Sequence, residues 1–343
     1  MPEHDDRSAT PPLSSVEPGS AMRCRTAALT PAAKRALGGL LPLLDDPDMR
    51  DVLVQVRDGA GCLWLDRGHG LEAVPGWRTP PEAVRRLATA LIAAGGRHLD
   101  ELHPVADTRL GDGIRVHAVL PPIAVAGAVV SIRLPPPAAP AFDDLVGAGL
   151  CAPRMAEWLR REVVSRRNLL ITGSTGSGKT TVLAALLGLV DPSERILIIE
   201  DVAELRPRHP HAIVLEARYA STEGVGEVPL DRLLQEALRM RPDRIVLGEC
   251  RGAEIATLLA ALNTGHDGGA GTLHASRLEE VPARLEALGA LAGLSPEALA
   301  RQAVSALHAV VHLARGAGGH RITAAGRLRI DSSGLLAVAE VSP

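Results

Sequence analysis

Aromatic residues, lysine and paired cysteines are all scarce in this chain of 343 residues. Phe, Trp and Tyr together make up 1% of the residues, which leaves little for stacking on the bases of single-stranded nucleic acid. The four cysteines lie far apart without a C-x-x-C pair, so the sequence predicts neither a zinc site nor a secreted disulfide framework. Only Lys34 and Lys179 are lysines, although Lys and Arg together number 37.

Neither sign of charge dominates. Forty acidic and 37 basic residues give a formal net charge of −3, so no global excess draws the chain onto DNA or anionic lipid, and we expect no stable DNA binding. The first 20 residues are acidic, proline-rich and without an apolar core, which argues against a signal peptide. They predict a disordered tail over residues 1–22. A cytoplasmic location fits these features best.

A long hydrophobic run is also missing. Residues 116–132 lack Asp, Glu, Lys and Arg, but this stretch is at the short limit for a membrane span and contains Pro121, Pro122 and Gly127. Two strands joined by a turn explain it better, so the sequence predicts no transmembrane anchor.

Hydrophobic residues make up 46% of the chain, which is enough for two globular cores. The stretch LPPPAAPA cannot continue a helix or a central strand, so we expect an interdomain linker over residues 135–141. Before it, residues 23–134 combine strand-length apolar runs with one helical pattern, which predicts a small α+β domain. The runs are 51–56, 61–65, 113–120 and 128–133, and the helical pattern is 80–96.

After the linker, residues 142–343 alternate apolar strand-length runs with helical segments. That alternation is typical of an α/β domain with a parallel sheet and crossover helices. The strand runs are NLLIT (168–172), RILIIED (195–201), AIVLE (212–216) and RIVLGE (244–249), and the helical segments include 180–190 and 230–240.

The segment GSTGSGKT, residues 173–180, matches the phosphate-loop (Walker A) pattern G-x-x-x-x-G-K-[ST] between a strand run and a helical segment. A chance Gly/Ser-rich turn explains it poorly, because lysine is so rare in this chain. Lys179 suits the β- and γ-phosphates of ATP as a compact charge, and the Thr180 hydroxyl suits Mg²⁺. The predicted nucleotide-binding residues are Gly173, Ser174, Thr175, Gly176, Ser177, Gly178, Lys179, Thr180 and Thr181.

Hydrolysis also needs a group that activates water, and carboxylates at strand ends are candidates. Glu200 ends one strand run and Glu249 ends another, so both are expected at the sheet edge where the phosphate loop lies. We interpret Glu249 as the catalytic base and Glu200 as an acid near the metal. Asp201 and Glu204 have an equally good structural explanation, as caps of the next segment or as partners of neighbouring arginines.

Four strings in this order resemble the type II/IV secretion-system ATPases, and within them the Tad/CpaF-like branch linked to tight-adherence pili and conjugal transfer. They are GSTGSGKT, LIIEDVAEL, LRMRPDRIVLGECRG and NTGHDGGAGTLHAS, within a match over roughly residues 100–341. The resemblance implies a RecA-like P-loop ATPase core with a smaller N-terminal PAS-like α+β domain. Gly248 stands where the common form of the second nucleotide-binding motif has Asp. The resemblance implies that glycine at this position is typical of the family.

In that family, histidines matching His266 and His274 couple the nucleotide to conformational change. Either histidine alone would be explained by simple packing or solvation. The resemblance also implies that arginines of the N-terminal domain reach the γ-phosphate, with Arg115 and Arg133 the best matches and Arg109 a weaker one. Arg218 and the pair Arg239/Arg241 match further family arginines without a defined role.

The resemblance implies a homohexameric ATPase at the inner face of the plasma membrane, acting on membrane platform proteins to assemble pili or export protein. ATP and Mg²⁺ are the expected ligands, and zinc is not expected. Two alternatives stay open: an ATPase for conjugal DNA or protein transfer, and a nucleotide-gated scaffold without turnover. The sequence specifies neither the cargo nor the direction of work.

Overall fold

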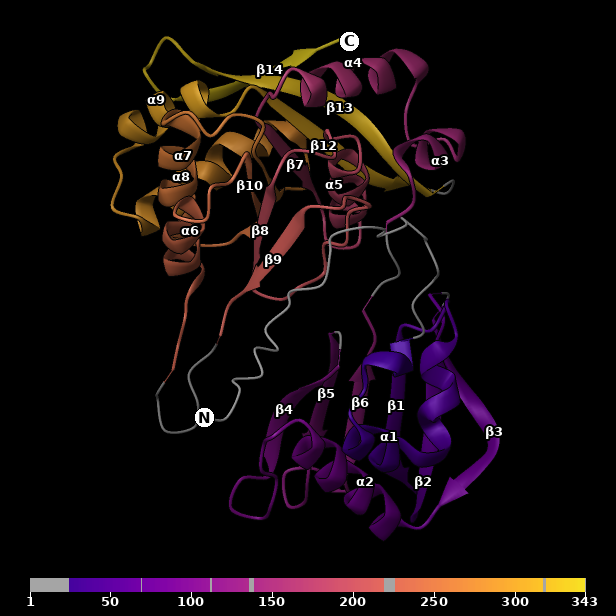
Figure 1. Cartoon of the computed structure of the whole chain (residues 1–343). Helices are drawn as coiled ribbons and strands as arrows, with labels where there is room; N and C mark the ends of the chain where they lie inside the picture. The colour runs from indigo at the N-terminus through magenta and orange to yellow at the C-terminus, as the bar shows by residue number, and fades with distance from the viewer. Residues whose placement is uncertain are drawn as a thin grey trace, which may run out of the picture. The chain divides into compact units, whose positions relative to one another are not determined.

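In the computed structural model, the described residues are 25–68, 70–111, 113–135, 139–218, 226–316 and 319–342. The chain divides into two compact units, residues 1–135 and 136–343, and the division falls within the proline-rich stretch (Figure 1). The predicted tail, residues 1–22, lies outside the described residues, as do residues 136–138 of the predicted linker.

The described part of unit 1 is built on a six-stranded antiparallel sheet. Its strands are β1 (Asp51–Arg57), β2 (Ala60–Asp66), β3 (Leu71–Thr79), β4 (Val105–Leu110), β5 (Ile114–Val119) and β6 (Val129–Arg133), in the order β3-β2-β1-β6-β5-β4. Strands β5 and β6 pair, so residues 116–132 form two strands as the sequence predicts.

Alternate residues of β1 are buried, because only one face of this sheet meets the core. Helix α2 (Pro81–Ala94) packs on that face through Val84, Ala88 and Leu91, each 0% exposed. Helix α1 (Pro31–Leu37) packs beside α2. Along the chain, α1 follows the short 3-10 helix η1 (Arg25–Ala28) and precedes the 3-10 helix η2 (Gly38–Asp45).

Unit 2 contains an eight-stranded sheet among its described residues. The strands are β7 (Leu169–Gly173), β8 (Ile196–Glu200), β9 (Ala212–Glu216), β10 (Arg244–Cys250), β11 (Ala270–His274), β12 (Ala309–Gly316), β13 (Gly319–Ile330) and β14 (Leu336–Val341). Their order is β14-β13-β12-β7-β11-β10-β8-β9. The six strands from β12 to β9 pair in parallel, whereas β13 pairs antiparallel with both β12 and β14.

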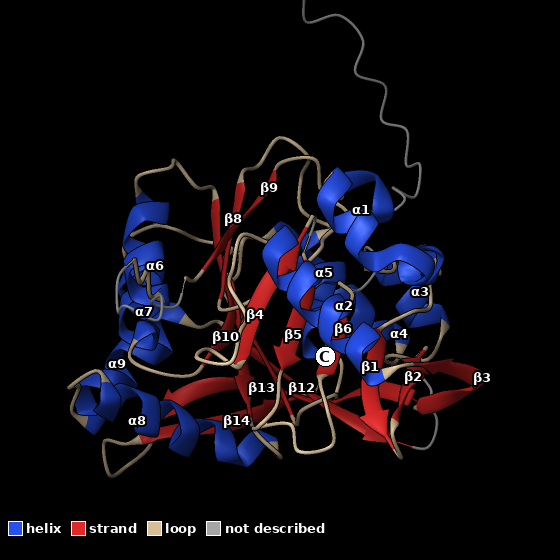
Figure 2. Cartoon of the chain, turned by 90° about the horizontal axis from the view of Figure 1, so that it is seen from below, coloured by secondary structure: helices blue, strands red, loops and turns tan. Residues whose placement is uncertain are grey.

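Helices cover both faces of this sheet (Figure 2). One layer holds α3 (Phe142–Gly147), α4 (Pro153–Val164) and α5 (Lys179–Leu187). The other holds α6 (Leu230–Leu238), α7 (Glu254–Asn263), α8 (Val281–Leu291), which the 3-10 helix η3 (Leu278–Glu280) precedes, and α9 (Pro296–Ala306).

The buried strands are apolar on both faces for this reason. Leu170 of β7 packs into the core under α6–α9, and its neighbour Ile171 packs into the core under α5. Ile198 and Ile199 of β8 divide in the same way, and all four are 0% exposed. The uninterrupted apolar runs in the sequence are therefore central strands of a two-sided sheet. Within the described ranges, no helix combines the length and the apolar character that a membrane crossing requires.

Candidate active site

Strand β7 leads through a short loop into helix α5. Gly176 and Gly178 have φ values of +71° and +92°, in the left-handed region that side chains with a Cβ rarely adopt. Gly178 is the N-cap of α5, so the unbonded amides of the first helical turn lie at this loop. A Cβ on Gly178 would also lie 3.1 Å from Cγ of His320, which is a close contact. The result is the backbone cradle of an anion site.

Lys179 closes this loop. Its Nζ donates hydrogen bonds to the carbonyl oxygens of Gly173 (2.9 Å) and Ser174 (3.0 Å), and the residue is 9% exposed. Burial lowers the pKa of Lys179, while the nearby Glu249 carboxylate raises it and Arg251 lowers it. A small ammonium with three donors fits this enclosed position, whereas a planar guanidinium would not.

The other predicted loop residues surround the start of α5. Ser174 and Thr175 are exposed, Thr180 is half-buried and Thr181 is exposed. Ser177 is 1% exposed, and its Oγ has no hydrogen-bond partner among the residues that the structure describes. The structure therefore brings the whole predicted loop together, with a buried hydroxyl that a ligand can satisfy.

The strand order places two further predicted residues beside the loop. His274 ends β11, where it pairs with Gly173 of β7, and its Nδ1 lies 3.5 Å from Thr175 Oγ1. Glu249 lies one strand further along, near the end of β10. Because β7, β11 and β10 are parallel, their carboxyl ends meet at one edge of the sheet.

The structure does not bring His266 to this edge. His266 follows α7 and precedes β11, and its Nδ1 lies 3.2 Å from the carbonyl oxygen of Ala261. Strand β11 runs from Ala270 to His274, so His266 lies before its amino end and His274 lies at its carboxyl end. The two predicted histidines are therefore at opposite ends of the strand.

A cationic side chain contacts the predicted base. Arg251 Nε donates to Glu249 Oε2 at 2.8 Å, and its Nη2 pairs with the same oxygen. Arg251 Nη1 lies 3.5 Å from Asp201 Oδ2. Asp201 thus pairs with an arginine distant in sequence rather than with a neighbour.

Glu254, at the start of α7, fixes the turn that carries Arg251. Its Oε1 accepts hydrogen bonds from the backbone amides of Arg251 (2.6 Å) and Gly252 (2.7 Å), and Glu254 is 8% exposed. Neither Arg251 nor Glu254 was among the predicted site residues. A signal was present, because an acidic residue in the first turn of a helix is a common cap of preceding amides.

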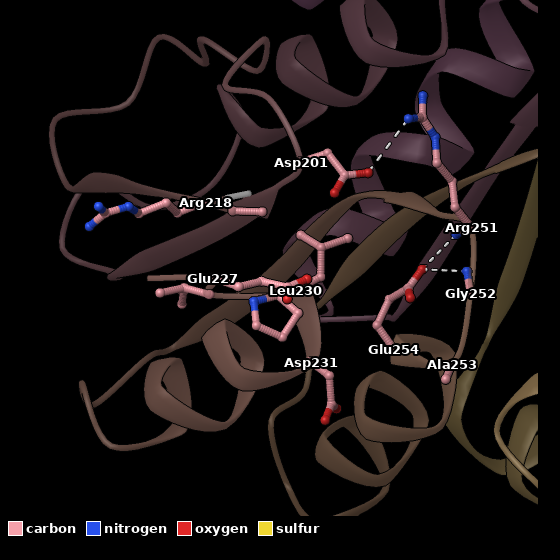
Figure 3. A pocket seen from close by; sticks show the side chains of 12 residues that line it. Asp201, Arg218, Glu227, Leu230, Asp231, Arg251, Gly252, Ala253 and Glu254 are labelled. Carbon is pink, nitrogen blue, oxygen red and sulfur yellow. Dashed lines mark hydrogen bonds and ion pairs between the residues drawn. The ribbon is translucent and has the colours of Figure 1, made fainter. Parts of the chain in front are cut away.

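A cavity of about 380 Å³ opens beside this cluster, at the carboxyl ends of β8, β9 and β10. Asp201, Arg251 and Glu254 line it together with Arg218, whose side chain extends away from the other three (Figure 3). Arg218 instead lies against Gly226.

Glu200 is buried, at 4% exposed, and its carboxylate accepts hydrogen bonds from the backbone amides of Glu204 (3.1 Å) and Leu205 (3.1 and 3.2 Å). The capping role considered for Asp201 and Glu204 therefore falls to Glu200. A Cβ on Gly248 would lie 2.5 Å from Glu200 Cγ, which is the steric reason for glycine there.

No group of three or more His, Cys, Asp or Glu side chains within the described ranges is arranged to hold a metal ion. Mg²⁺ at a phosphate site takes most of its ligands from phosphate and water, and only one or two from the protein. The half-buried hydroxyl of Thr180, on the first turn of α5 beside the loop, fits that requirement. The metal roles of Thr180 and Glu200 stay predictions.

The predicted arginines of unit 1 form one row across its sheet. Arg109 of β4 pairs with Arg115 of β5, Arg115 pairs with Arg133 of β6, and Arg133 pairs with Asp51 of β1. Partial burial and the neighbouring Arg115 lower the pKa of Arg109. Three arginines thus stand in register on adjacent strands, and their role toward nucleotide stays a prediction.

A buried histidine behind the loop was also missed. His312 of β12 is 5% exposed, and its Nδ1 lies 2.9 Å from Oγ1 of Thr172, the residue before the loop. Burial lowers the pKa of His312, although Ser276, Glu279 and Glu280 raise it. A lone histidine in an apolar strand gives no signal in the sequence that would distinguish it from a packed core residue.

Comparison with known proteins identifies a family that this chain matches. The family model described as "Type II/IV secretion system protein" matches residues 77–325. A putative conjugal transfer protein of Mycobacterium tuberculosis is 49% identical over 83% of this chain and 82% of that protein. The conjugal transfer protein TrbB of Rhizobium radiobacter is 32% identical over 81% of this chain and 83% of that protein.

Solved structures support the fold. The pilus retraction motor PilT with bound ADP has a TM-score of 0.57 at 21% identity, covering 88% of this chain and 80% of that chain. The ATPase DotB of Legionella pneumophila has a TM-score of 0.55 at 21% identity, covering 88% and 78%. The predicted fold class, a RecA-like α/β core with a smaller N-terminal α+β domain, is confirmed. This chain belongs to the type II/IV secretion system protein family.

Proposed function

We propose that this chain is an ATP-hydrolysing motor that powers assembly of Tad-like pili or protein export. The observation that carries the proposal is the position of Lys179 inside the phosphate loop, at the edge of the sheet where the strand that carries Glu249 also ends. In this proposal, one edge of the sheet supplies a cation for the phosphates and a proton acceptor, which are the two groups that hydrolysis of a phosphoanhydride needs.

Phosphate binding uses groups already in place. The amides at the start of α5 and the Lys179 ammonium, now held by two loop carbonyls, provide donors for the phosphate oxygens. The buried Ser177 hydroxyl lies in the same loop. Mg²⁺, when bound, supplies charge neutralisation at the phosphates, and Thr180 is the residue we propose to hold it.

Glu249 is the proposed base. Its carboxylate takes a proton from the attacking water while the water oxygen bonds to the γ-phosphorus and the bond to the ADP oxygen breaks. His274 lies beside Thr175 of the loop, where it can report the state of the phosphates to β11. Glu200 supports this edge by holding the segment after β8.

The two units have separate tasks in this proposal. Residues 142–343 form the ATPase domain, and residues 135–141 form the linker. The domain over residues 23–134 supplies Arg115 and Arg133, whose charges would stabilise the transferring phosphoryl group. We propose further that six copies form a ring at the inner face of the plasma membrane and act on platform proteins there.

Conjugal transfer is the second candidate function. It is favoured by the names of relatives that share 49% and 32% identity with this chain over most of their length. Stimulation of hydrolysis by DNA, lost at high salt, would favour transfer over pilus assembly, because phosphate contacts are salt-sensitive.

Measuring ATP hydrolysis and ATP binding by the wild type, Glu249→Gln and Lys179→Ala tests the enzyme against a non-hydrolysing scaffold. We expect Glu249→Gln to bind ATP normally and to turn over at least about tenfold more slowly, since a general base is lost. Lys179→Ala should weaken binding itself. Equal and negligible rates in the wild type and Glu249→Gln would favour the scaffold.

A further inference from the structure

A buried histidine lies behind the phosphate loop, and the proposed mechanism does not use it. His312 of β12 is 5% exposed, and it stands opposite Thr172 of β7 in the strand pairing. Its Nδ1 lies 2.9 Å from Thr172 Oγ1. Thr172 is itself 0% exposed and directly precedes Gly173, the first residue of the loop. The ring therefore contacts the residue that leads into the loop.

The same ring reaches the segment that follows His274. A backbone hydrogen bond joins it to Ser276, two residues after the end of β11. Between these two residues, the amide of Ala275 donates to the carbonyl oxygen of Gly173 at 3.4 Å. His312 thus bridges the carboxyl ends of β7 and β11, which are the strands that lead into the loop and carry His274.

A neutral imidazole suits this bridge, because it has one donor nitrogen and one acceptor nitrogen. The pKa of His312 is lowered from the usual 6.5, mainly by burial and less by the Lys179 ammonium, so the ring is uncharged near neutral pH. The Thr172 hydroxyl has a second acceptor at 3.3 Å, the carbonyl oxygen of Val311. Loss of the ring would therefore leave this buried hydroxyl paired while removing its link to His312.

Strand β12 also lies against the loop through its backbone. A Cβ on Gly173 would lie 2.5 Å from the carbonyl oxygen of Leu313, the residue after His312, so the two backbones leave no space between them. A shift of β12 relative to β7 would therefore displace the start of the loop. A displacement of about 1 Å in a group that positions the reacting atoms can cost about a hundredfold in rate.

We propose that His312 is a positioning residue for ATP hydrolysis, whose ring holds the start of the phosphate loop and the segment after His274 in fixed register with each other. His312 acts through Thr172 and Ser276 rather than on the nucleotide. This inference rests on the proposed function, because it requires that ATP is hydrolysed at the loop.

The first test removes the ring and then restores part of it. His312→Leu loses both hydrogen bonds but keeps an apolar side chain. We expect kcat for ATP to fall at least about tenfold and the Kd for ADP to change less than about threefold, because misplacement costs more in the transition state than in ground-state binding. His312→Asn carries an oxygen at the same number of bonds from Cβ as Nδ1, so it can keep the contact with Thr172. Its kcat should return to within about threefold of the wild type.

His308→Leu is the matched control. His308 directly precedes β12, and its Nδ1 accepts a hydrogen bond from the Asn168 amide at 2.9 Å, at the amino end of the strand. This substitution should lower the Tm, as His312→Leu does, but leave kcat within about twofold of the wild type. Calorimetry measures each Tm, and each variant is assayed well below its own Tm.

The second test asks whether His312 acts through Thr172. Thr172→Val keeps the shape of the side chain and removes the hydroxyl, and it should lower kcat at least about fivefold. The double variant with His312→Leu should be no more than about twofold slower than His312→Leu alone, because both substitutions break the same contact. If His312→Leu does not fold, Thr172→Val and His312→Asn carry the test.

Three results would overturn the proposal. They are a kcat within about twofold of the wild type for His312→Leu or Thr172→Val, an Asn variant as slow as the Leu variant, and losses that multiply in the double variant. If the wild type hydrolyses no ATP, the proposed function itself fails. If the wild type turns over and Glu249→Gln is slow, but Thr172→Val keeps its kcat, the proposed function stands and only the positioning role is refuted.

Discussion

Arg244, at the amino ends of the parallel strands of unit 2 (the amino edge), and Arg251, at their carboxyl ends (the carboxyl edge), differ in burial. At the amino edge, Arg244 is 2% exposed and forms two hydrogen bonds with Glu194, at 2.8 and 3.0 Å. Asn168, 0% exposed, donates to Ala306 O and accepts from Gly269 N. At the carboxyl edge, Arg251 is largely exposed, and its contacts include Glu249 and Asp201.

This difference separates stability from chemistry within one sheet. A buried polar group with all its bonds made is costly to disturb and holds one arrangement. An exposed ion pair contributes little to stability. The predictions below test that division, from the largest expected effect to the smallest.

Arg244→Ala should be the most destabilising of the substitutions considered. It leaves Glu194 half-paired in a poorly solvated site, and breaking a buried pair costs about 3–5 kcal/mol. For a domain of this size we expect the Tm to fall by roughly 6–20 °C. Differential scanning calorimetry measures it. A fall in Tm of less than about 1 °C would show that the buried pair of Arg244 and Glu194 does not stabilise the fold.

Gly248→Ala tests the packing at the carboxyl edge, because Gly248 lies in β10 directly before Glu249. The new Cβ would lie 2.5 Å from Glu200 Cγ and push that carboxylate off the amides that it caps. Overpacking of this kind costs about 1–3 kcal/mol, and we expect ATP hydrolysis to fall with stability. Chemical denaturation and an ATPase assay on the same samples check both. Normal stability would mean that Glu200 is not held against Gly248.

Glu254→Gln weakens the anchor of the turn that carries Arg251. Its two short backbone bonds lose their charge, at a cost of about 1 kcal/mol in stability. Loss of order in this turn should lower kcat several-fold and leave the Kd for ATP unchanged. Isothermal titration and steady-state kinetics separate the two. Asp143→Asn, which removes an exposed acid paired with Arg160 in the other helix layer, is a control with no expected effect on kcat.

A pair of histidines gives the smallest effect. His308, bonded to the Asn168 amide at the amino edge, and His312, next to the loop, both have a pKa lowered from the usual 6.5, mainly by burial. Below pH 6.5 the unfolded chain binds protons that the folded chain resists, so stability falls as the pH drops. We expect a Tm loss of no more than about 2–4 °C per histidine. Each of His308→Gln and His312→Gln should reduce this pH dependence, and a dependence unchanged in both would refute it.

The strands and the loop were predictable because their signals are local. Residues 169–171 and 196–199 are apolar on both faces of the sheet, and residues 173–180 carry glycines where the backbone needs positive φ. The arginine row in unit 1 was predicted as separate residues, but its alignment depends on strand register, which the sequence does not state.

The contacts of the site were less predictable because they join distant segments. Asp201 meets Arg251, fifty residues away, only because β8 and β10 are adjacent in the sheet. His266 and His274 stand in one string of the sequence, and no local pattern indicates that strand β11 separates them. Strands β12, β13 and β14, which extend one side of the sheet, and the buried His312 were not predicted.

The central claim is that the carboxyl edge performs hydrolysis and the amino edge holds the fold. The most direct measurement is kcat for ATP of Glu249→Gln and Arg244→Ala, each assayed well below its own Tm. We predict that Glu249→Gln keeps the wild-type Tm and loses at least about tenfold in kcat, whereas Arg244→Ala melts much earlier and keeps kcat within about threefold. A folded Arg244→Ala as slow as Glu249→Gln, or a Glu249→Gln as fast as the wild type, would contradict the account.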